Sequence, residues 1–573
     1  MNLSRRVQSI LAVDFGTATT RSSLIDLVDG QYRLVASAST RTTLRDVTIG
    51  WAWTIAQIEN ITQLELTDHQ GVLIISDGGG TGIDALVITS SAVRPLTAVV
   101  LGLMPNVSIR SARRALSGTY VNVVANLSIA DQRDLSAQIN TILKANPDLI
   151  FVSGGIDGGN EKGVMELVQV AALATKLAPE DEQPIVIFAG NEALTEKVQA
   201  SFADIPDRLL IANNVRPDLM HEEVGNARLQ LTRAFGDYIS QQASGFESLQ
   251  GQSVTPTAQG VSNVVRWLAE VEPDERAVIH LDIGSATSTL VVGMSDNISA
   301  NIFSELGIGH SLASAVERFN IERLFSRLPF PFTEVALRDY VYNKSLNPDV
   351  IPMTPHDLYI EQAIAYEIAQ IVKEETLSVV SPKMREAINT PAKIILAGAV
   401  LTEGLHHGLM AMQGLDLLSP EGIVELYSDP SVIVPLMGAF AYIEPTATVQ
   451  VLENQALLNL GTAYCIEGST RMGRTALKIK LKVDDRVIEH ELAMGDIWAA
   501  PITIGKQVEV DIRAKRGVTI GGKRRIRQKV VAGLAGIIFD ARGRNLAAIP
   551  LAQRNERYAA WWQGVTNGQV AYQ

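Results

Sequence analysis

Two turns far apart in the chain share one pattern. In each, an apolar strand ends in Asp, a Gly and a turn rich in hydroxyl side chains follow, and a second strand begins. The two copies are residues 10–20 and 278–288. One such hairpin with a Gly-Thr turn is an ordinary structure, but a second copy at a domain-scale distance predicts a duplicated unit. This duplication constrains the fold more than any other feature of the sequence.

The residue types in these turns suit phosphate and magnesium. A strand end holds its Asp rigidly, Gly lets the backbone approach a phosphate, and hydroxyl and N–H groups donate hydrogen bonds. Mg²⁺ needs only one or two carboxylates besides phosphate oxygens and water. We therefore expect Asp14 and Asp282 to lie near a metal ion and near the water molecule that would attack a bound phosphate. The expected phosphate-binding residues are Gly16, Thr17, Thr20, Gly284, Ser285 and Thr287.

Length and composition bound the class of protein. A chain of 573 residues is too long for one core, so two to four domains are expected. No uncharged apolar run of membrane-spanning length occurs, and Asp14 and Gly16 interrupt the only stretch near the start that could resemble a secretory signal. We expect a cytoplasmic protein without a membrane partner. The single cysteine, Cys465, excludes an intramolecular disulfide and is expected to be a small buried residue.

The charge distribution is uneven. The formal net charge of −13 argues against general nucleic-acid binding, yet residues 523–529 form a dense basic run. No aromatic residues interleave with this run, which favours a solvated face or a docking surface for an acidic partner protein.

Two further regions differ in pattern from the hairpins. Residues 85–235 alternate strands with helix-length segments, which predicts a small α/β domain with a parallel sheet. Asp157, Asn160 and Asn191 follow strands of this region and either cap helices or bind a ligand. Residues 449–573 alternate apolar and polar side chains, which predicts an antiparallel module with one wet face.

The order of the motifs carries a family signal. A phosphate hairpin at Asp14 is followed by a small-faced helix at Gly260, the second hairpin at Asp282, a strand and turn at Gly398, and a small-faced helix at Gly438. This order resembles the superfamily of actin, heat-shock chaperone and sugar kinase ATPases. More specifically, the chain resembles the glutamate mutase L family over roughly residues 8–455. The segments that carry this likeness are residues 46–50, 90–105, 154–160, 188–191 and 214–217.

The resemblance implies an α/β fold in which two RNase H-like lobes of the actin-like ATPase type clasp ATP and Mg²⁺. The first lobe would comprise residues 8–84 and 236–272, and the second residues 273–448. An inserted α/β domain (85–235) and a C-terminal β-rich module (449–573) would complete the chain. Gly307, Gly309 and Gly398 would join the nucleotide site, with Gly398 beside adenosine.

The implied function is that of a chaperone-like accessory or reactivating factor for an adenosylcobalamin-dependent mutase, which would be its protein partner. Lobe closure on ATP would transmit force to that partner. An oligomer is compatible with this role. The sequence leaves open whether ATP is hydrolysed or only bound.

The second hairpin departs from the family pattern. Ser285 stands where the family has a second Gly, and Thr289 stands where it has an Asp. These changes leave nucleotide binding better supported than hydrolysis. Two rival functions therefore remain: a pseudo-ATPase scaffold related to actin-like proteins, and a small-molecule kinase on the same fold.

Overall fold

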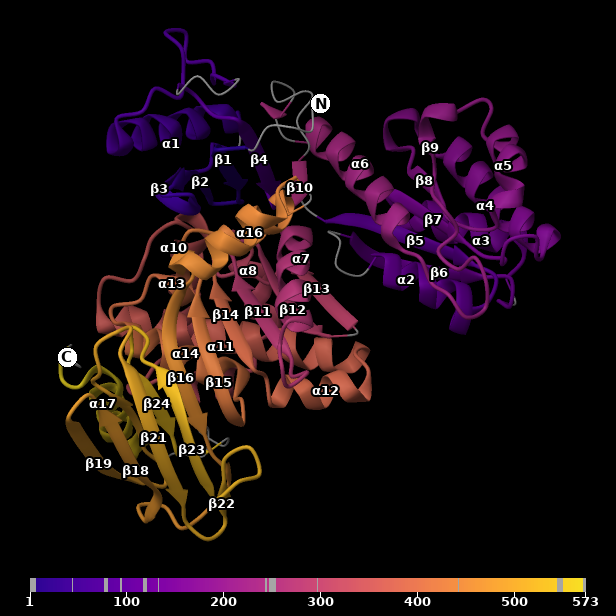
Figure 1. The fold of residues 1–573 in the computed structure, drawn as a ribbon. Helices are drawn as coiled ribbons and strands as arrows, with labels where there is room; N and C mark the ends of the chain where they lie inside the picture. Colours follow the sequence, from indigo (N-terminus) through magenta and orange to yellow (C-terminus); the bar gives the residue numbers. More distant parts are fainter. Residues whose placement is uncertain are drawn as a thin grey trace. The chain divides into compact units, whose positions relative to one another are not determined.

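The computed structural model describes residues 7–43, 45–76, 81–92, 95–116, 121–131, 133–242, 245–246, 254–295, 297–441, 443–543 and 550–569. The chain folds as two compact units (Figure 1). Unit 1 comprises Met1–Thr42, Gly50–Val87 and Gly260–Gln573, and unit 2 comprises Thr43–Ile49 and Ile88–Gln259. The domain boundaries expected from the sequence pattern remain predictions.

The first sheet of unit 1 holds the first hairpin. Its strands lie in the order β4-β1-β2-β3, and their bounds are β1 (Ser9–Phe15), β2 (Thr19–Val28), β3 (Gln31–Arg41) and β4 (Ala85–Ser90). β1 is apolar and buried beyond its first residue, and it pairs antiparallel with β2. Helix α1 (Val47–Thr62) contributes Trp51, whose ring meets Phe15 edge to face. The predicted hairpin at residues 10–20 is thereby confirmed.

The second sheet of unit 1 has the order β13-β12-β11-β14-β15-β16-β24-β20. Its strands are β11 (Val278–Ile283), β12 (Thr287–Met294), β13 (Asn297–Ser304), β14 (Lys393–Ala397), β15 (Gly422–Ser428), β16 (Leu458–Cys465), β20 (Ile497–Ala500) and β24 (Ile537–Asp540). β11 and β12 form the second predicted hairpin, and β14 runs parallel to β11. Because β16, β20 and β24 all lie beyond residue 448, this sheet continues across the boundary expected for a separate C-terminal module.

Helices cover both faces of the second sheet. Successive residues of a strand point to opposite sides, so each strand contributes side chains to both layers of helices. Ile279, Leu281 and Ile283 pack against one set of helices, whereas Val278 belongs to the core that also includes β1. The first set includes α11 (Pro355–Val379), α14 (His407–Leu418) and α17 (Leu551–Thr566). The second set is α7 (Thr257–Glu270), α15 (Ile433–Phe440) and α16 (Pro445–Val451). Unit 1 also contains α8 (Leu312–Ala315), α9 (Ile321–Ser326), α10 (Glu334–Leu346), α12 (Pro382–Asn389) and α13 (Ala399–Thr402).

The remaining strands of unit 1 form two small antiparallel sheets. One has the order β19-β18-β21-β23 and the other pairs β17 with β22. The bounds are β17 (Glu467–Gly468), β18 (Thr475–Val483), β19 (Arg486–Ala493), β21 (Gln507–Ala514), β22 (Val518–Thr519) and β23 (Arg525–Val531). β18 alternates buried and exposed side chains, as the predicted wet face requires.

Unit 2 is built on a five-stranded parallel sheet in the order β6-β5-β7-β8-β9. Its strands are β5 (Leu96–Gly102), β6 (Val121–Ser128), β7 (Leu149–Ser153), β8 (Ile185–Phe188) and β9 (Leu209–Ile211). One face packs on α3 (Leu135–Ala145), α4 (Glu161–Leu177) and α5 (Thr195–Ser201), and the other on α2 (Arg110–Leu116) and α6 (Gly225–Gln242) (Figure 1). The short strand β10 (Val254–Pro256) pairs with residues 88–90 of β4. The parallel α/β pattern predicted from the sequence is present.

Throughout the part of the chain that the structure describes, no helix combines the length and apolar character needed to cross a bilayer.

Candidate functional site

The two hairpins have the same turn geometry. The N–H of Gly16 donates to the carbonyl of Thr19 at 3.1 Å, and the N–H of Gly284 donates to the carbonyl of Thr287 at 3.0 Å. In both copies the Asp lies one residue before the end of its strand. The duplication seen in sequence is therefore a duplication of backbone structure.

Each turn leaves two N–H groups available. Within the described residues, the amides of Thr17 and Ala18 have no hydrogen-bond acceptor, and the same holds for Ser285 and Ala286. These residues are only partly buried. Clustered free amides in a turn form a concavity that binds anions. The available donors in each turn are therefore the amides that follow Gly16 and Gly284, because the N–H groups of these two glycines are already used. The sequence pattern predicts N–H donors around the two glycines but does not single out Ala18 and Ala286, because a methyl side chain gives no chemical signal.

Asp14 and Asp282 come together in unit 1. Asp14 is buried, with a relative exposure of 6%. Removal from water and the negative charge of Asp14 together raise the pKa of Asp282 to about 7. A neighbouring like charge disfavours the charged form of a carboxyl group. The charge of Asp14 thus acts on Asp282, and their expected shared role at a metal stays a prediction.

Asp429 is a third carboxylate of this site that the sequence analysis missed. Its side chain is 1% exposed and accepts hydrogen bonds from the N–H groups of Ile433 and Val434 at 2.8 and 2.9 Å, at the start of α15. Burial and the negative charge of Asp14 raise the pKa of Asp429 to about 6, although these two hydrogen bonds lower it. The available signal was its position directly after β15, because Asp14 and Asp282 also stand at strand ends.

Arg21 supplies the positive charge among these acids. It lies opposite Asp14 in the register of β1 and β2, and it lowers the pKa of both Asp282 and Asp429. It also forms an ion pair with Glu403 at 3.1 Å. We call Asp14, Asp282, Asp429 and Arg21 the carboxylate site. The second hairpin has Thr289 at the equivalent position, opposite Asp282.

Thr20 faces the interior of the protein. Its hydroxyl is fully buried and shares a 2.9 Å hydrogen bond with the hydroxyl of Thr42, which also donates to the carbonyl of Gly16 at 2.8 Å. The equivalent Ser288 donates to the carbonyl of Leu306. These hydroxyls stabilise their hairpins, whereas Thr17 and Thr287 remain partly exposed.

Ser285 holds the following loop. Its hydroxyl accepts the N–H of His310 at 3.0 Å and hydrogen-bonds His310 Nδ1 at 2.9 Å. The N–H of Gly309 donates to the carbonyl of Ser285 at 2.9 Å, and that of Gly307 donates to the hydroxyl of Ser311 at 2.7 Å. Burial and the charge of Arg41 lower the pKa of His310, which favours its neutral ring. Gly307 and Gly309 thus bring this loop against the second hairpin.

Gly398 lies directly beside Asp282. It follows β14 with φ +88°, and a Cβ built on it would stand 2.2 Å from the carbonyl oxygen of Ile283 and 2.9 Å from Asp282 Oδ1. Only glycine fits this close approach at a positive φ. Its expected role beside adenosine stays a prediction.

The model of the MutL protein family matches residues 10–456. The chain belongs to the MutL family. This is the glutamate mutase L family that the sequence motifs resemble. Protein MutL of Clostridium tetanomorphum is 23% identical over 490 residues, which cover 78% of this chain and 99% of that protein.

Solved structures similar to this MutL family member include two sugar kinases. Gluconate kinase from Lactobacillus acidophilus is 9% identical, with 79% of this chain and 93% of that chain covered and a TM-score of 0.31. Xylulose kinase from Bifidobacterium adolescentis is 9% identical, with 78% and 94% covered and a TM-score of 0.28.

The carboxylate site of this MutL family member fits a divalent cation held jointly with phosphate. The described residues contain no group of three or more His, Cys, Asp and Glu side chains arranged to hold a metal ion by themselves. Asp14 and Asp282 provide two carboxylates, and burial together with their repulsion raises the pKa of Asp282. A cation between them would relieve this repulsion, and Mg²⁺ takes its remaining ligands from phosphates and water.

Cys465 and the basic run lie outside this site. Burial raises the pKa of the Cys465 thiol well above its usual value, which fits the predicted small buried residue. In the basic run, Arg525 pairs with Asp511 at 3.1 Å and Arg527 pairs with Glu509. These ion pairs across β21 and β23 neutralise part of the positive charge.

Proposed function

We propose that this MutL family protein binds ATP with Mg²⁺ at the carboxylate site. The observation that supports the proposal is the electrostatic interaction of Asp14 with Asp282, the strand-end carboxylates of the two hairpins. The free amides of Thr17, Ala18, Ser285 and Ala286 would hold phosphate oxygens, and Asp14 and Asp282 would hold the metal. Mg²⁺ would neutralise phosphate charge. The fold would be that of two RNase H-like lobes.

In the cell, the protein would act in the cytoplasm as an accessory or reactivating factor for an adenosylcobalamin-dependent mutase. Membership of the MutL family supports this role. The protein's own residues would bind and orient the triphosphate, since phosphoryl transfer is catalysed mainly by positioning and charge neutralisation. The mutase would be the protein partner.

The first experiment measures ATP binding by calorimetry with and without Mg²⁺. Asp14→Asn and Asp282→Asn each keep the side-chain shape and remove a negative charge, so each is expected to weaken Mg²⁺-dependent binding at least about tenfold, or about 1.4 kcal/mol. Asp339→Asn on the exposed side of α10 is the matched control. Unchanged binding in both site variants would refute the nucleotide site.

A second experiment tests the partner. A mutase from the same organism is inactivated by turnover and then incubated with the protein, ATP and Mg²⁺. We expect activity to return with the wild type and not with Asp14→Asn. Recovery that is equal without nucleotide would contradict the proposed role.

One observation favours the pseudo-ATPase alternative. Thr289 pairs directly with Asp282 and faces the same side of the sheet, where the family pattern has a second carboxylate. Binding without phosphate release, together with nucleotide-dependent assembly in light scattering, would support a scaffold over an ATPase.

A further inference from the structure

The strand order of unit 2 creates a second place where a ligand fits. β6 lies on one side of β5 and β7 on the other, so the connections after β5 and β7 diverge at the carboxyl ends of these strands. Open parallel sheets bind ligands outside such a switch point. After β5 the chain forms a five-residue π-helix, Pro105–Ile109, a conformation that is frequent at functional sites.

A cavity of about 520 Å³ lies at this point. Its volume falls in the range of small-molecule sites. One side is apolar and includes Leu103, Met104, Ile129 and Leu219. Met104 and Leu219 are 57% and 66% exposed. Such exposure of large apolar side chains around a cavity leaves a surface that a ring system would cover.

The loop between β7 and α4 is held rigidly beneath the cavity. Asn160 Oδ1 accepts the N–H of Gly163 at 3.0 Å and caps α4. Asp157 Oδ1 accepts from Glu192 N–H at 3.0 Å and from Asn214 Nδ2 at 2.8 Å. Asn191 caps the next helical turn and also accepts from Gly158. Asn160 and Asn191 are thus helix caps, and Asp157 ties three segments together, so the site is preformed.

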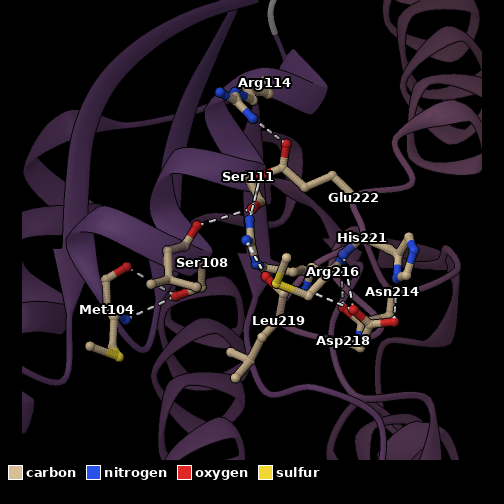
Figure 2. Close-up of polar contacts among 12 residues, drawn as sticks. Met104, Ser108, Ser111, Arg114, Asn214, Arg216, Asp218, Leu219, His221 and Glu222 are labelled. Carbon is tan, nitrogen blue, oxygen red and sulfur yellow. Dashed lines mark hydrogen bonds and ion pairs between the residues drawn. The ribbon is translucent and has the colours of Figure 1, made fainter.

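Two polar side chains, Ser153 and Arg216, lie at the cavity. Ser153 ends β7, lines the cavity and is 1% exposed. Arg216 also lines the cavity, and its Nε is buried without a partner. Its Nη1 donates to the hydroxyl of Ser111 at 3.1 Å and its Nη2 to the carbonyl of Leu219 at 2.7 Å, as Figure 2 shows. A buried polar atom without a partner costs free energy that a ligand can recover.

The polar side favours an anion. Among the lining residues, Lys162 and Arg216 are positive and Glu166 is negative. Lys162 also lies in the first turn of α4, a 17-residue helix whose N-terminal amides attract anions. Glu222 forms ion pairs with Arg216 and Arg114 and holds the Arg216 guanidinium in place (Figure 2).

We propose that unit 2 binds a mononucleotide in this cavity. Its aromatic ring would lie on the apolar side beside Leu103 and Met104, and its phosphate would lie at the start of α4 beside Lys162. The Ser153 hydroxyl would hydrogen-bond the ligand at the floor of the cavity. This site is distinct in residues and in unit from the carboxylate site.

The experiment uses the full chain with Asp14→Asn and Asp282→Asn, so that binding at the carboxylate site cannot contribute. Flavin mononucleotide is titrated by fluorescence and adenosine monophosphate by calorimetry. The corresponding compound without phosphate is titrated in the same way for comparison. We expect at least one mononucleotide to bind at least tenfold more tightly than its nucleoside. The better probe identifies the ring that the cavity takes.

Lys162 is exposed on α4, and Lys162→Glu is expected to weaken binding of the better probe at least tenfold. Lys144→Glu on α3 makes the same change of charge away from the cavity and is the control. Ser153→Ala, with folding checked by circular dichroism, is expected to weaken it severalfold. Absence of binding by both mononucleotides would overturn the proposal, as would equal affinity in the Lys162→Glu and Lys144→Glu proteins.

Discussion

At the scale of single residues, the carboxylate site combines three acids with one arginine. Burial and mutual repulsion raise the pKa of Asp282 to about 7 and that of Asp429 to about 6. Arg21 opposes both shifts. Without a cation, the folded protein therefore retains protons that the unfolded chain releases near pH 4.

This retention gives a stability prediction with a definite sign. Because the folded-state pKa of Asp282 is raised, its contribution is fully present below pH 4 and is lost as pH rises to about 7. The metal-free protein should thus lose stability on the order of 2–4 kcal/mol from this residue across that window. Asp282→Asn should reduce the change of stability with pH and leave only the part due to Asp429. Asp339→Asn should leave this change unaltered. Urea unfolding at a series of pH values measures this, and an unchanged slope in Asp282→Asn would contradict it.

Ser285 gives a second prediction at this scale. Ser285→Ala removes the acceptor of the His310 N–H and the partner of its ring, so the loop at residues 307–311 should open more often. The free energy needed to open this loop should fall by about 1–2 kcal/mol. Hydrogen exchange of the loop amides should speed up, while Ser378→Ala, which removes one local bond on α11, should leave them unchanged. Unaltered exchange in Ser285→Ala would show that the hydroxyl does not hold the loop.

At the scale of elements, α7 and α15 cross at unusually short distance. A Cβ on Gly438 would stand 1.8 Å from the carbonyl oxygen of Gly260, and a Cβ on Gly260 would stand 2.2 Å from that of Pro435. Asn263 Nδ2 donates to the carbonyl of Gly438 at 3.0 Å and fixes the crossing. The small-faced helices predicted from the sequence therefore serve a close helix contact inside the core that includes β1 and β11.

Gly438→Ala should separate these helices. The obstructing atom belongs to the backbone, so the clash cannot be relieved by a side-chain rotation, and overpacking of this kind typically costs about 1–3 kcal/mol or more. Gly236→Ala in α6, where a Cβ meets nothing within 4 Å, should be neutral or stabilise by about 0.5–1 kcal/mol. Thermal unfolding compares the two, and equal melting temperatures would refute the close crossing.

At the scale of the whole molecule, the C-terminal region is part of the core of unit 1. β16, β20 and β24 extend the sheet that holds Asp282. Helix α17 packs on this sheet, where Trp562 is fully buried and Trp561 donates its indole N–H to the carbonyl of Gly495 at 2.8 Å (Figure 1). The C-terminal residues therefore support the fold that positions the carboxylate site.

Trp562→Ala tests this dependence. Loss of a fully buried indole should cost about 3–5 kcal/mol and should also weaken ATP binding through the loosened sheet. Trp53→Ala removes an indole that is 65% exposed on α1 and should change stability by less than about 1 kcal/mol. Denaturant unfolding and calorimetry provide the comparison. A small effect of Trp562→Ala would mean that the C-terminal region folds apart from the sheet.

Much of the local structure could be predicted, because its signals lie within short windows. The hairpins at Asp14 and Asp282 and the parallel strands of unit 2 follow from apolar runs and turn residues. The extension of the second sheet by β16, β20 and β24 could not be predicted, since strand pairing between distant segments leaves no local signal. Arg21 and Asp429 were missed for the same reason, because each gains its role only beside residues from other strands.

The sequence by itself determined the paired hairpins, their acidic strand ends and the family to which they belong, since these depend on residue order alone. The tertiary structure decided which groups are available for chemistry. It turned Thr20 inward, tied Ser285 to His310, freed the amides of Ala18 and Ala286, and placed Asp282 where its pKa rises to about 7. Hydrogen-bond partners and electrostatic fields depend on distances in space, and folding sets those distances between segments that the sequence keeps far apart.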